Sequence, residues 1–253
     1  MPSFKDHFSS QSSSYSKYRP DYPQELYNFI LSEVKERKTA WDCGTGNGQA
    51  AVVLSQYFEK VYATDPSAEQ IKNATQKSNI EYRIATAENS TLPDNSVDLI
   101  TVAQALHWFD FYKFYSEVKR VAKPGALLAV WSYETCHTND DVDKIFFRFY
   151  KEILGDYWAY ERRHVENAYR DIPFPFSQVR AEVFHMKKQW NLQDFLGYLS
   201  TWSAVQKYVK TNGTNPLELV EFDFRNAWGN PATIRDVSFP VTIKTFLLAK
   251  REL

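Results

Sequence analysis

The stretch Ala40-Trp41-Asp42-Cys43-Gly44-Thr45-Gly46-Asn47-Gly48 decides the fold of this 253-residue chain. Three of the chain's eight glycines follow a short apolar run within this one stretch. A strand that ends at Cys43 must turn sharply here into a helix over residues 49–58. Glycines permit the positive φ values and the close backbone approach that a ligand lying across such a turn requires. The stretch therefore predicts a strand, a turn and a helix that together cradle a nucleotide.

A second apolar run, Val61-Tyr62-Ala63-Thr64, ends in Asp65, about twenty residues further along the chain. The Asp65 carboxylate should lie level with the glycine turn, where it can accept hydrogen bonds from both hydroxyls of a ribose. An adenosine-containing cofactor is therefore predicted. We assign the neighbouring Thr45 and Pro66 to the same cofactor site.

The spacing of the turn separates two classes of cofactor. Dinucleotide folds typically show G-x-G-x-x-G, with the pyrophosphate at a helix N-terminus. This chain instead has Gly44-x-Gly46-x-Gly48 preceded by Asp42. That acid would repel a pyrophosphate and attract an ammonium or a sulfonium. The segment resembles the first motif of the class I S-adenosylmethionine-dependent methyltransferases, D-x-G-x-G-x-G. A nicotinamide-dependent oxidoreductase and a non-catalytic S-adenosylmethionine-binding protein remain alternatives.

Strand and helix patterns alternate along the first half of the chain, which is typical of a parallel sheet with right-handed crossovers. The pattern and the resemblance predict an α/β, Rossmann-like fold with seven strands, the last antiparallel, helices on both faces and a helical cap insertion. The expected strands are 39–43, 60–64, 80–84, 97–103, 125–131, 179–189 and 237–250. The expected helices are 23–35, 48–58, 67–77, 110–122, 192–210 and 216–227.

We expect one methyltransferase domain over residues 1–253, with an N-terminal arm over 1–22 and helical cap segments at 133–178 and 191–235. Aromatic residues make up 16% of the chain, and many of them lie in the cap segments. A helical cap needs large side chains for its own core, which is the simpler interpretation of these rings. The alternative is that some of them line a closed pocket that excludes water. We place Tyr198, Trp202 and Tyr208 in the core first.

The segment after the third strand, Ala85-Thr86-Ala87-Glu88, matches the part of the family that holds the adenine ring. By this resemblance the Ala87 backbone N–H faces the ring edge, and Glu88 accepts from the exocyclic amine. Glu88 could equally be a solvated loop charge.

The fourth strand leads into Ala103-Gln104-Ala105-Leu106-His107-Trp108-Phe109-Asp110, at the sheet edge where doubly wound folds place their reacting centre. This segment resembles the type 11 branch that includes the trans-aconitate methyltransferases. The resemblance places Gln104 and Trp108 at the cofactor, and a Trp ring would favour a sulfonium. His107 is a candidate general base. It could instead shape the pocket or cap the following helix.

The N-terminal arm ends in Tyr15-Ser16-Lys17-Tyr18-Arg19-Pro20. In the resembled branch such an arm folds over the cofactor. We therefore include Tyr18 and Arg19 among the cofactor-binding residues, because an Arg can pair bidentately with a carboxylate. Arg19 could also simply anchor the first helix.

Composition narrows the class of partner. Lys plus Arg total 30 against 31 for Asp plus Glu, so no overall positive field favours nucleic acid. Neither a signal peptide nor a membrane span is predicted, and the two cysteines are expected to be reduced thiols, which suits a cytoplasmic protein. No Cys/His cluster has metal-ligand spacing.

The predicted reaction is methyl transfer from S-adenosylmethionine to a small molecule, with carboxylic acids, phenols and quinone-like compounds all open as acceptors. The basic patch Arg162-Arg163-His164 could meet an acidic acceptor.

Overall fold

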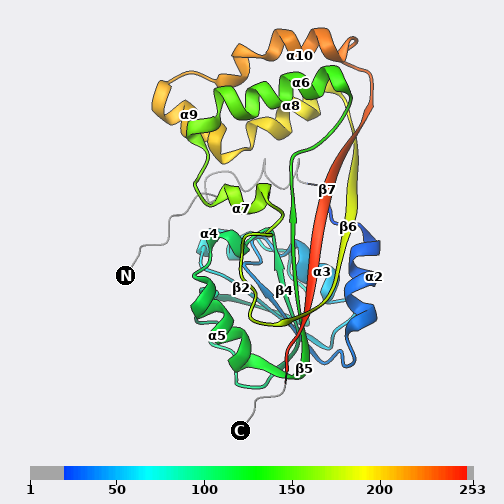
Figure 1. Ribbon diagram of the computed structural model, residues 1–253, viewed down its shortest axis with the longest axis vertical. Coiled ribbons are helices and arrows are strands. Elements are labelled where there is room, and N and C mark those ends of the chain that lie inside the picture. Colours follow the sequence, from blue (N-terminus) through cyan, green and yellow to red (C-terminus); the bar gives the residue numbers. More distant parts are fainter. Residues whose placement is uncertain (1–19, 250–253) are drawn as a thin grey trace.

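The computed structural model describes residues 20–249, and the predicted site residues Tyr18 and Arg19 lie outside that range. A single seven-stranded sheet runs through the molecule in the order β3-β2-β1-β4-β5-β7-β6 (Figure 1). Its strands are β1 (Thr39–Cys43), β2 (Lys60–Asp65), β3 (Ile80–Ile84), β4 (Val97–Ala103), β5 (Ala122–Tyr133), β6 (Ser177–Trp190) and β7 (Arg235–Leu247).

Strands β1 to β5 pair in parallel, and β7 runs antiparallel to both β5 and β6. The predicted fold class is therefore confirmed, including the antiparallel last strand. Parallel pairing brings the carboxyl ends of β1, β2 and β4 to one edge of the sheet, so that Cys43, Asp65 and Ala103 end there together.

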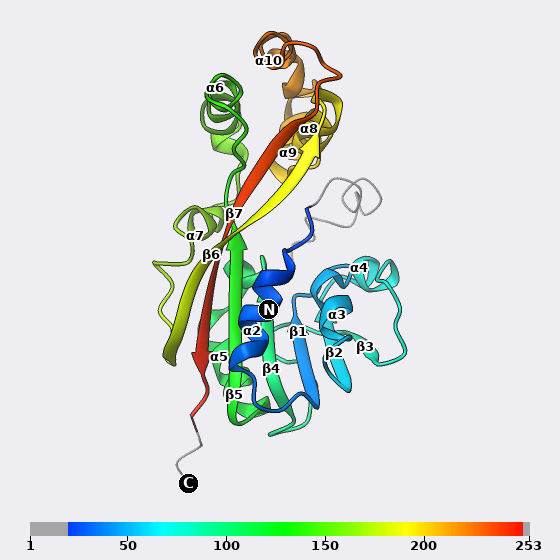
Figure 2. The same ribbon diagram turned by 90° about the vertical axis from the view of Figure 1, so that its right-hand side faces the viewer.

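Helices cover both faces of this sheet (Figure 2). Helix α2 (Gln24–Glu33) and α3 (Gln49–Leu54) pack on one face, and α5 (Phe111–Val121) packs on the other, each with its own buried apolar cluster. Helix α4 (Ala68–Lys72) contacts β2 and β3. The remaining helices are α6 (Asp140–Arg148), α7 (Arg162–Glu166), α8 (Leu192–Ser200), α9 (Ser203–Asn212) and α10 (Glu221–Trp228).

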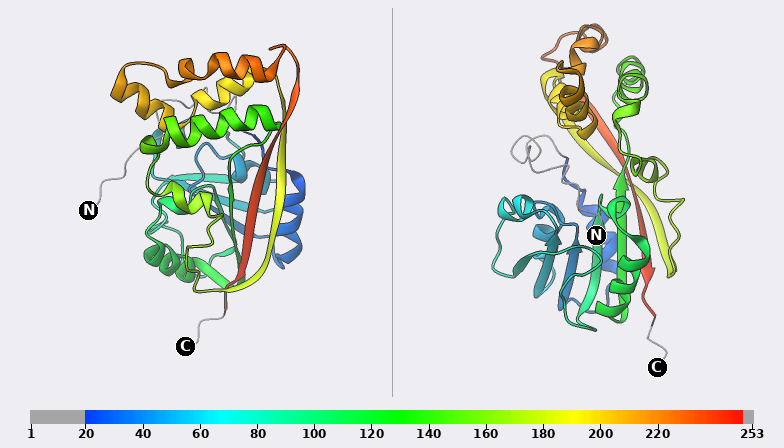
Figure 3. Two further views of the ribbon diagram at one scale, coloured as in Figure 1. Left: turned by 45° about the horizontal axis from the view of Figure 1, so that its top comes forward. Right: turned by 90° about the vertical axis from the view of Figure 1, so that its left-hand side faces the viewer.

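The long strands β5, β6 and β7 continue beyond the rest of the sheet toward α6, α8, α9 and α10 (Figure 3). These helices, which fall in the predicted cap segments, lie together beyond the carboxyl ends of the parallel strands. Helix α7 lies between them and the sheet (Figure 1). One continuous apolar core joins α2 and the sheet to the helices of the cap.

Two predicted helices are wrong as single elements. The expected helix 192–210 is broken at Trp202, whose backbone is extended, with φ −70° and ψ 137°. This break lets the Trp202 ring pack edge-on against Phe146, with centroids 5.4 Å apart. The expected helix 216–227 begins as a 3₁₀ turn, Pro216–Leu219, before α10. In the first case tertiary burial of a large ring outweighs local helix propensity.

Within residues 20–249, no helix has the length and apolar composition needed to cross a bilayer. No group of three or more His, Cys, Asp or Glu side chains is arranged to hold a metal ion in that part of the chain. Cys43 and Cys136 are both buried free thiols.

Candidate active site

The glycine turn between β1 and α3 has left-handed backbone at all three glycines, with φ values of +68° at Gly44, +55° at Gly46 and +88° at Gly48. A Cβ at Gly44 would lie 2.6 Å from the Ala105 Cβ, and a Cβ at Gly48 would overlap the Tyr82 hydroxyl. At Gly46 the nearest atom would be 3.9 Å away. The outer two glycines are thus required by packing. The middle one keeps the backbone open to close approach by a ligand.

Asp65 lies at the end of β2, directly beside this turn. Its Oδ2 accepts the Gly46 N–H at 2.9 Å, and its Oδ1 accepts the Ser67 N–H at 2.9 Å. The backbone N–H groups of Gly44 and Thr45 donate to the Thr64 carbonyl, which fixes the turn against β2. A carboxylate has about four lone-pair sites, more than these two backbone bonds to Asp65 use. The half-buried Pro66 follows it.

Asp42 is 1% exposed and points into the protein. The Thr45 hydroxyl donates to its Oδ2 at 2.5 Å, and the Thr101 hydroxyl donates to its Oδ1 at 2.8 Å. Burial raises the pKa of Asp42 to about 6, against the lowering effect of these hydrogen bonds. The carboxylate therefore anchors the base of the turn and carries a charge that is unfavourable to bury.

That unfavourable charge gives a testable prediction for Asp42→Asn. The pKa of Asp42 is about 6 in the folded protein, against an ordinary value of 3.8. The stability of the folded protein therefore falls as the pH rises from about 4 to about 6, because the folded state binds the Asp42 proton more tightly than the unfolded state. At pH 8 the free energy of unfolding of Asp42→Asn should exceed that of the wild-type protein by about 1 to 3 kcal/mol, because the variant buries no charge and its amide can still bond both hydroxyls. Urea titrations at pH 4.5 and pH 8 measure this gain. A stability gain over the wild-type protein that is no larger at pH 8 than at pH 4.5 contradicts the assignment.

The segment after β3 lies next to Asp65, since the Ala85 N–H donates to the Asp65 carbonyl at 3.2 Å. Ala87 is buried in a tight turn closed by the Asn89 N–H on the Thr86 carbonyl. Glu88 accepts the Asp110 N–H at 2.9 Å. One Glu88 oxygen therefore fixes this segment to the turn after β4, and an adenine-binding role for Ala87 and Glu88 stays a prediction.

The turn after β4 carries Gln104, His107 and Trp108. The Gln104 side chain, expected toward the cofactor, instead binds the backbone of Tyr133 at both ends of its amide. Trp108 is 37% exposed, and its ring lies 4.7 Å from that of His107. Trp108 thus remains accessible at the sheet edge, as its predicted role requires.

His107 is buried, and its Nδ1 lies 2.9 Å from the Tyr169 hydroxyl. Burial, with a smaller effect of the Arg162 charge, lowers the pKa of His107 to about 3. Burial also raises the pKa of Tyr169 well above its ordinary value. The imidazole is therefore neutral at physiological pH, with one nitrogen engaged by a phenol. This geometry favours the structural interpretation of His107 over the catalytic one.

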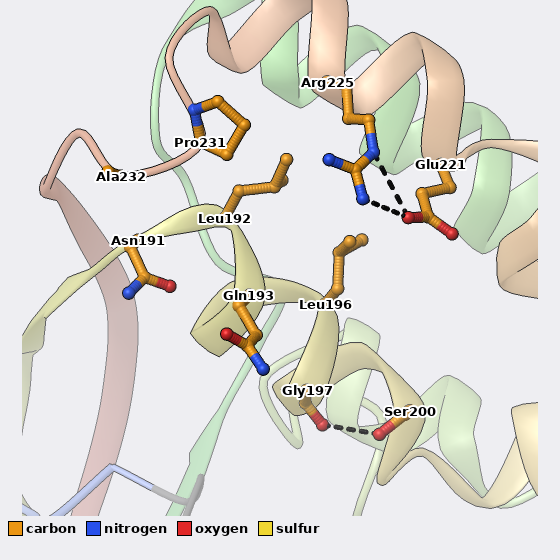
Figure 4. A pocket seen from close by; sticks show the side chains of 10 residues that line it. All are labelled: Asn191, Leu192, Gln193, Leu196, Gly197, Ser200, Glu221, Arg225, Pro231 and Ala232. Atoms are coloured by element: carbon orange, nitrogen blue, oxygen red, sulfur yellow. Dashed lines mark hydrogen bonds and ion pairs between the residues drawn. The ribbon is translucent and has the colours of Figure 1, made fainter.

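The cap aromatics mainly pack against one another. Tyr198 and Trp202 are buried with rings 5.7 Å apart, and the half-buried Tyr208 packs on Tyr157 at 4.8 Å. The core interpretation of these three rings agrees with this packing. A cavity of about 660 Å³ does lie in the cap (Figure 4), but α8, α10 and the segment before β7 line it, at a distance from the glycine turn. Its lining includes Leu192, Leu196, Glu221, Arg225 and Pro231.

Two residues that shape the site are not expected from the sequence. Thr101, a polar residue within an apolar strand, binds Asp42, and the break in that strand's apolar pattern is a signal that could have revealed it. Tyr82 donates to the Thr75 carbonyl at 2.8 Å, in the loop after α4, and packs over Gly48. No sequence signal links Tyr82 to the glycine turn, because the contact depends on the sheet.

Comparisons with known proteins decide the family. Residues 41–130, from β1 through most of β5, match a family model described as a methyltransferase domain. A Dictyostelium discoideum protein with the provisional name of methyltransferase is 38% identical over 256 residues, covering 98% of this chain and 96% of its own length. The chain belongs to the class I S-adenosylmethionine-dependent methyltransferases. The nicotinamide-dependent alternative is not favoured by these relatives.

Two further comparisons agree with this assignment. A Saccharomyces cerevisiae protein, provisionally named an S-adenosylmethionine-dependent methyltransferase, is 24% identical over 282 residues, with 96% of each chain covered. A solved structure of a provisionally named type II methyltransferase from Anaeromyxobacter dehalogenans has a TM-score of 0.86 at 38% identity. It covers 92% of this chain and 100% of its own. The methyltransferase family is thus supported, while membership of the trans-aconitate branch stays a prediction.

Proposed function

We propose that this methyltransferase binds S-adenosylmethionine across the turn Gly44–Gly48 and transfers its methyl group to a small molecule bound under the cap. The observation that carries the proposal is the bond between the Asp65 carboxylate and the Gly46 N–H. This bond places Asp65, the proposed ribose acceptor, beside Gly46, the glycine of the turn at which a ligand can approach the backbone closely. The residues present therefore fit an adenosine group.

When bound, the cofactor supplies a methyl group on a positively charged sulfur, which is a good leaving group. Asp65 would hold the ribose, the Gly46 backbone would permit close approach, and Trp108 would face the sulfonium. The chain's main contribution is alignment and exclusion of water, which can supply on the order of 7 to 11 kcal/mol. The neutral His107 is not required as a base for a carboxylate acceptor.

Carboxylic acids are the acceptor class best supported by the charges near the cap. Arg162 begins α7, between the cap and the sheet; its Nε donates to the Tyr150 hydroxyl at 2.9 Å, and its guanidinium lies 5.0 Å from the Trp158 ring. Over residues 20–249, no carboxylate lies within ion-pair distance of Arg162. Burial is the main cause of the lowered pKa of His107, and the Arg162 charge adds to it. A carboxylate could therefore pair with Arg162 close to the reacting edge.

A labelled methyl-transfer screen tests this proposal. Purified protein and methyl-labelled S-adenosylmethionine are incubated with small carboxylic acids, phenols and amines of matched carbon skeleton. We expect base-labile methyl ester product with acids, and Arg162→Gln should lower its rate by at least about tenfold, the effect of removing a charged hydrogen bond of roughly 1.5 kcal/mol. Arg225→Gln, which removes the exposed ion pair with Glu221, is the control. Methylation of amines alone would refute the carboxylate class.

A further inference from the structure

Gln104 occupies an unusual backbone conformation at the end of β4. Its φ is +54°, in the left-handed region that residues other than glycine rarely adopt. The β4–β5 ladder ends at Ala103 and Trp131, and the Gln104 N–H donates once more to the Trp131 carbonyl at 2.9 Å. The chain then turns away from the sheet at this residue.

The side chain of Gln104 replaces the strand that has turned away. Its Oε1 accepts the Tyr133 N–H at 2.8 Å, and its Nε2 donates to the Tyr133 carbonyl at 3.1 Å. Tyr133 is 5% exposed, so without Gln104 both backbone groups would lose their partner in a buried place. The amide thus extends the ladder by one residue through a side chain.

The two segments joined by this bridge lead to opposite parts of the site. On one side, Ala105 and Phe109 lie against Gly44 of the glycine turn. On the other side, Tyr133 pairs with Val241 of β7, and its ring meets that of Phe239 at 6.1 Å. The chain then enters the cap through residues 134–139. Gln104 therefore lies between the cofactor side of the site and the segment that leads into the cap.

We propose that Gln104 is a positioning residue that couples the turn at residues 105–109, on the cofactor side, to residues 133–139, where the chain enters the cap. The coupling would keep the methyl donor and the methyl acceptor in line. This inference rests on the proposed function. The bridge carries a shift of residues 105–109 to residue 133, because a pair of hydrogen bonds joins the half-buried Gln104 amide to the buried Tyr133 backbone. Since this chemistry depends on alignment, a misplacement of about 1 Å could cost about a hundredfold in rate.

Hydrogen exchange with S-adenosylhomocysteine as the probe tests the coupling without any acceptor. In the wild-type protein, the probe should slow amide exchange both in residues 105–109 and in residues 133–139. In Gln104→Ala, the probe should still bind, because the structure engages both ends of the Gln104 amide with the Tyr133 backbone and not with the cofactor side that the sequence predicted. It should still protect residues 105–109, while its protection of residues 133–139 is lost.

Asn79→Ala is the matched control. The Asn79 amide donates to the Ser55 and Phe58 carbonyls, at 2.8 and 3.0 Å, so its loss also removes two bonds between a side chain and the backbone. This variant should keep protection in both segments. If Gln104→Ala does not fold, Gln104→Glu serves instead, because it keeps an acceptor for the Tyr133 N–H and replaces the donor with an oxygen that repels the Tyr133 carbonyl.

The outcomes separate the two proposals. Equal protection of residues 133–139 in the wild-type protein and the Gln104 variants, or none in the wild-type protein, overturns the coupling and leaves cofactor binding intact. Loss of that protection in Asn79→Ala as well would assign the effect to general destabilisation and also overturn it. Absence of any probe binding to the wild-type protein rejects the proposed function instead.

Discussion

Replacing Gly48 with alanine should destabilise the folded protein by roughly 2 to 5 kcal/mol, from left-handed backbone strain together with overpacking. The added Cβ would overlap the Tyr82 hydroxyl and lie 3.0 Å from Cζ of the same ring. That hydroxyl cannot move aside freely, because it donates to the Thr75 carbonyl. Urea unfolding of the variant beside the wild-type protein measures the loss.

Gly46→Ala is the matched control for this prediction. Its φ is also positive, but the nearest atom to its Cβ would be 3.9 Å away, so only the backbone strain of about 1 to 2 kcal/mol applies. The double variant Gly48→Ala with Tyr82→Phe should recover part of the lost stability by removing the overlapped oxygen. Equal stability of the Gly46 and Gly48 variants would show that packing over the turn is not the cause.

Asp65→Ala should weaken S-adenosylhomocysteine binding by at least tenfold, or about 1.4 kcal/mol or more. The variant loses both the proposed ribose acceptor and the carboxylate that holds the Gly46 N–H. Isothermal titration calorimetry gives the affinity, and thermal unfolding reports any separate loss of stability.

Asp94→Ala controls for the change in net charge, because Asp94 is an exposed acid paired with Arg120. This variant should bind the probe as the wild-type protein does. Unchanged affinity in Asp65→Ala would remove Asp65 from the cofactor site.

The sequence predicts the parallel part of the fold well because its signals are local. Short runs rich in apolar residues mark β1, β2 and β4, and Ser67 caps α4 by accepting the Gln70 N–H, a role that serine often takes directly before a helix. The glycine spacing predicts the left-handed turn as well. Packing adds a distinction that the motif does not contain, namely that Gly44 and Gly48 are constrained by neighbours and Gly46 is not.

The parts that the sequence does not predict depend on contacts between distant residues. The environment of His107 is set by Tyr169, 62 residues further along the chain, and no sequence pattern around His107 predicts this contact. The Gln104 bridge to Tyr133 likewise needs the register of β4 on β5. The break of the expected helix at Trp202 depends on rings that α6 and the following segment supply, including Phe146 and Trp158.

Calorimetric titration of the wild-type protein with S-adenosylhomocysteine, and in parallel with NAD, tests the central claim most directly. We expect saturable binding of one S-adenosylhomocysteine per chain and no binding of NAD, because the turn lacks the G-x-G-x-x-G spacing that is typical of pyrophosphate sites. Binding of NAD without S-adenosylhomocysteine, or no binding of either compound, would contradict a cofactor site at Gly44–Gly48.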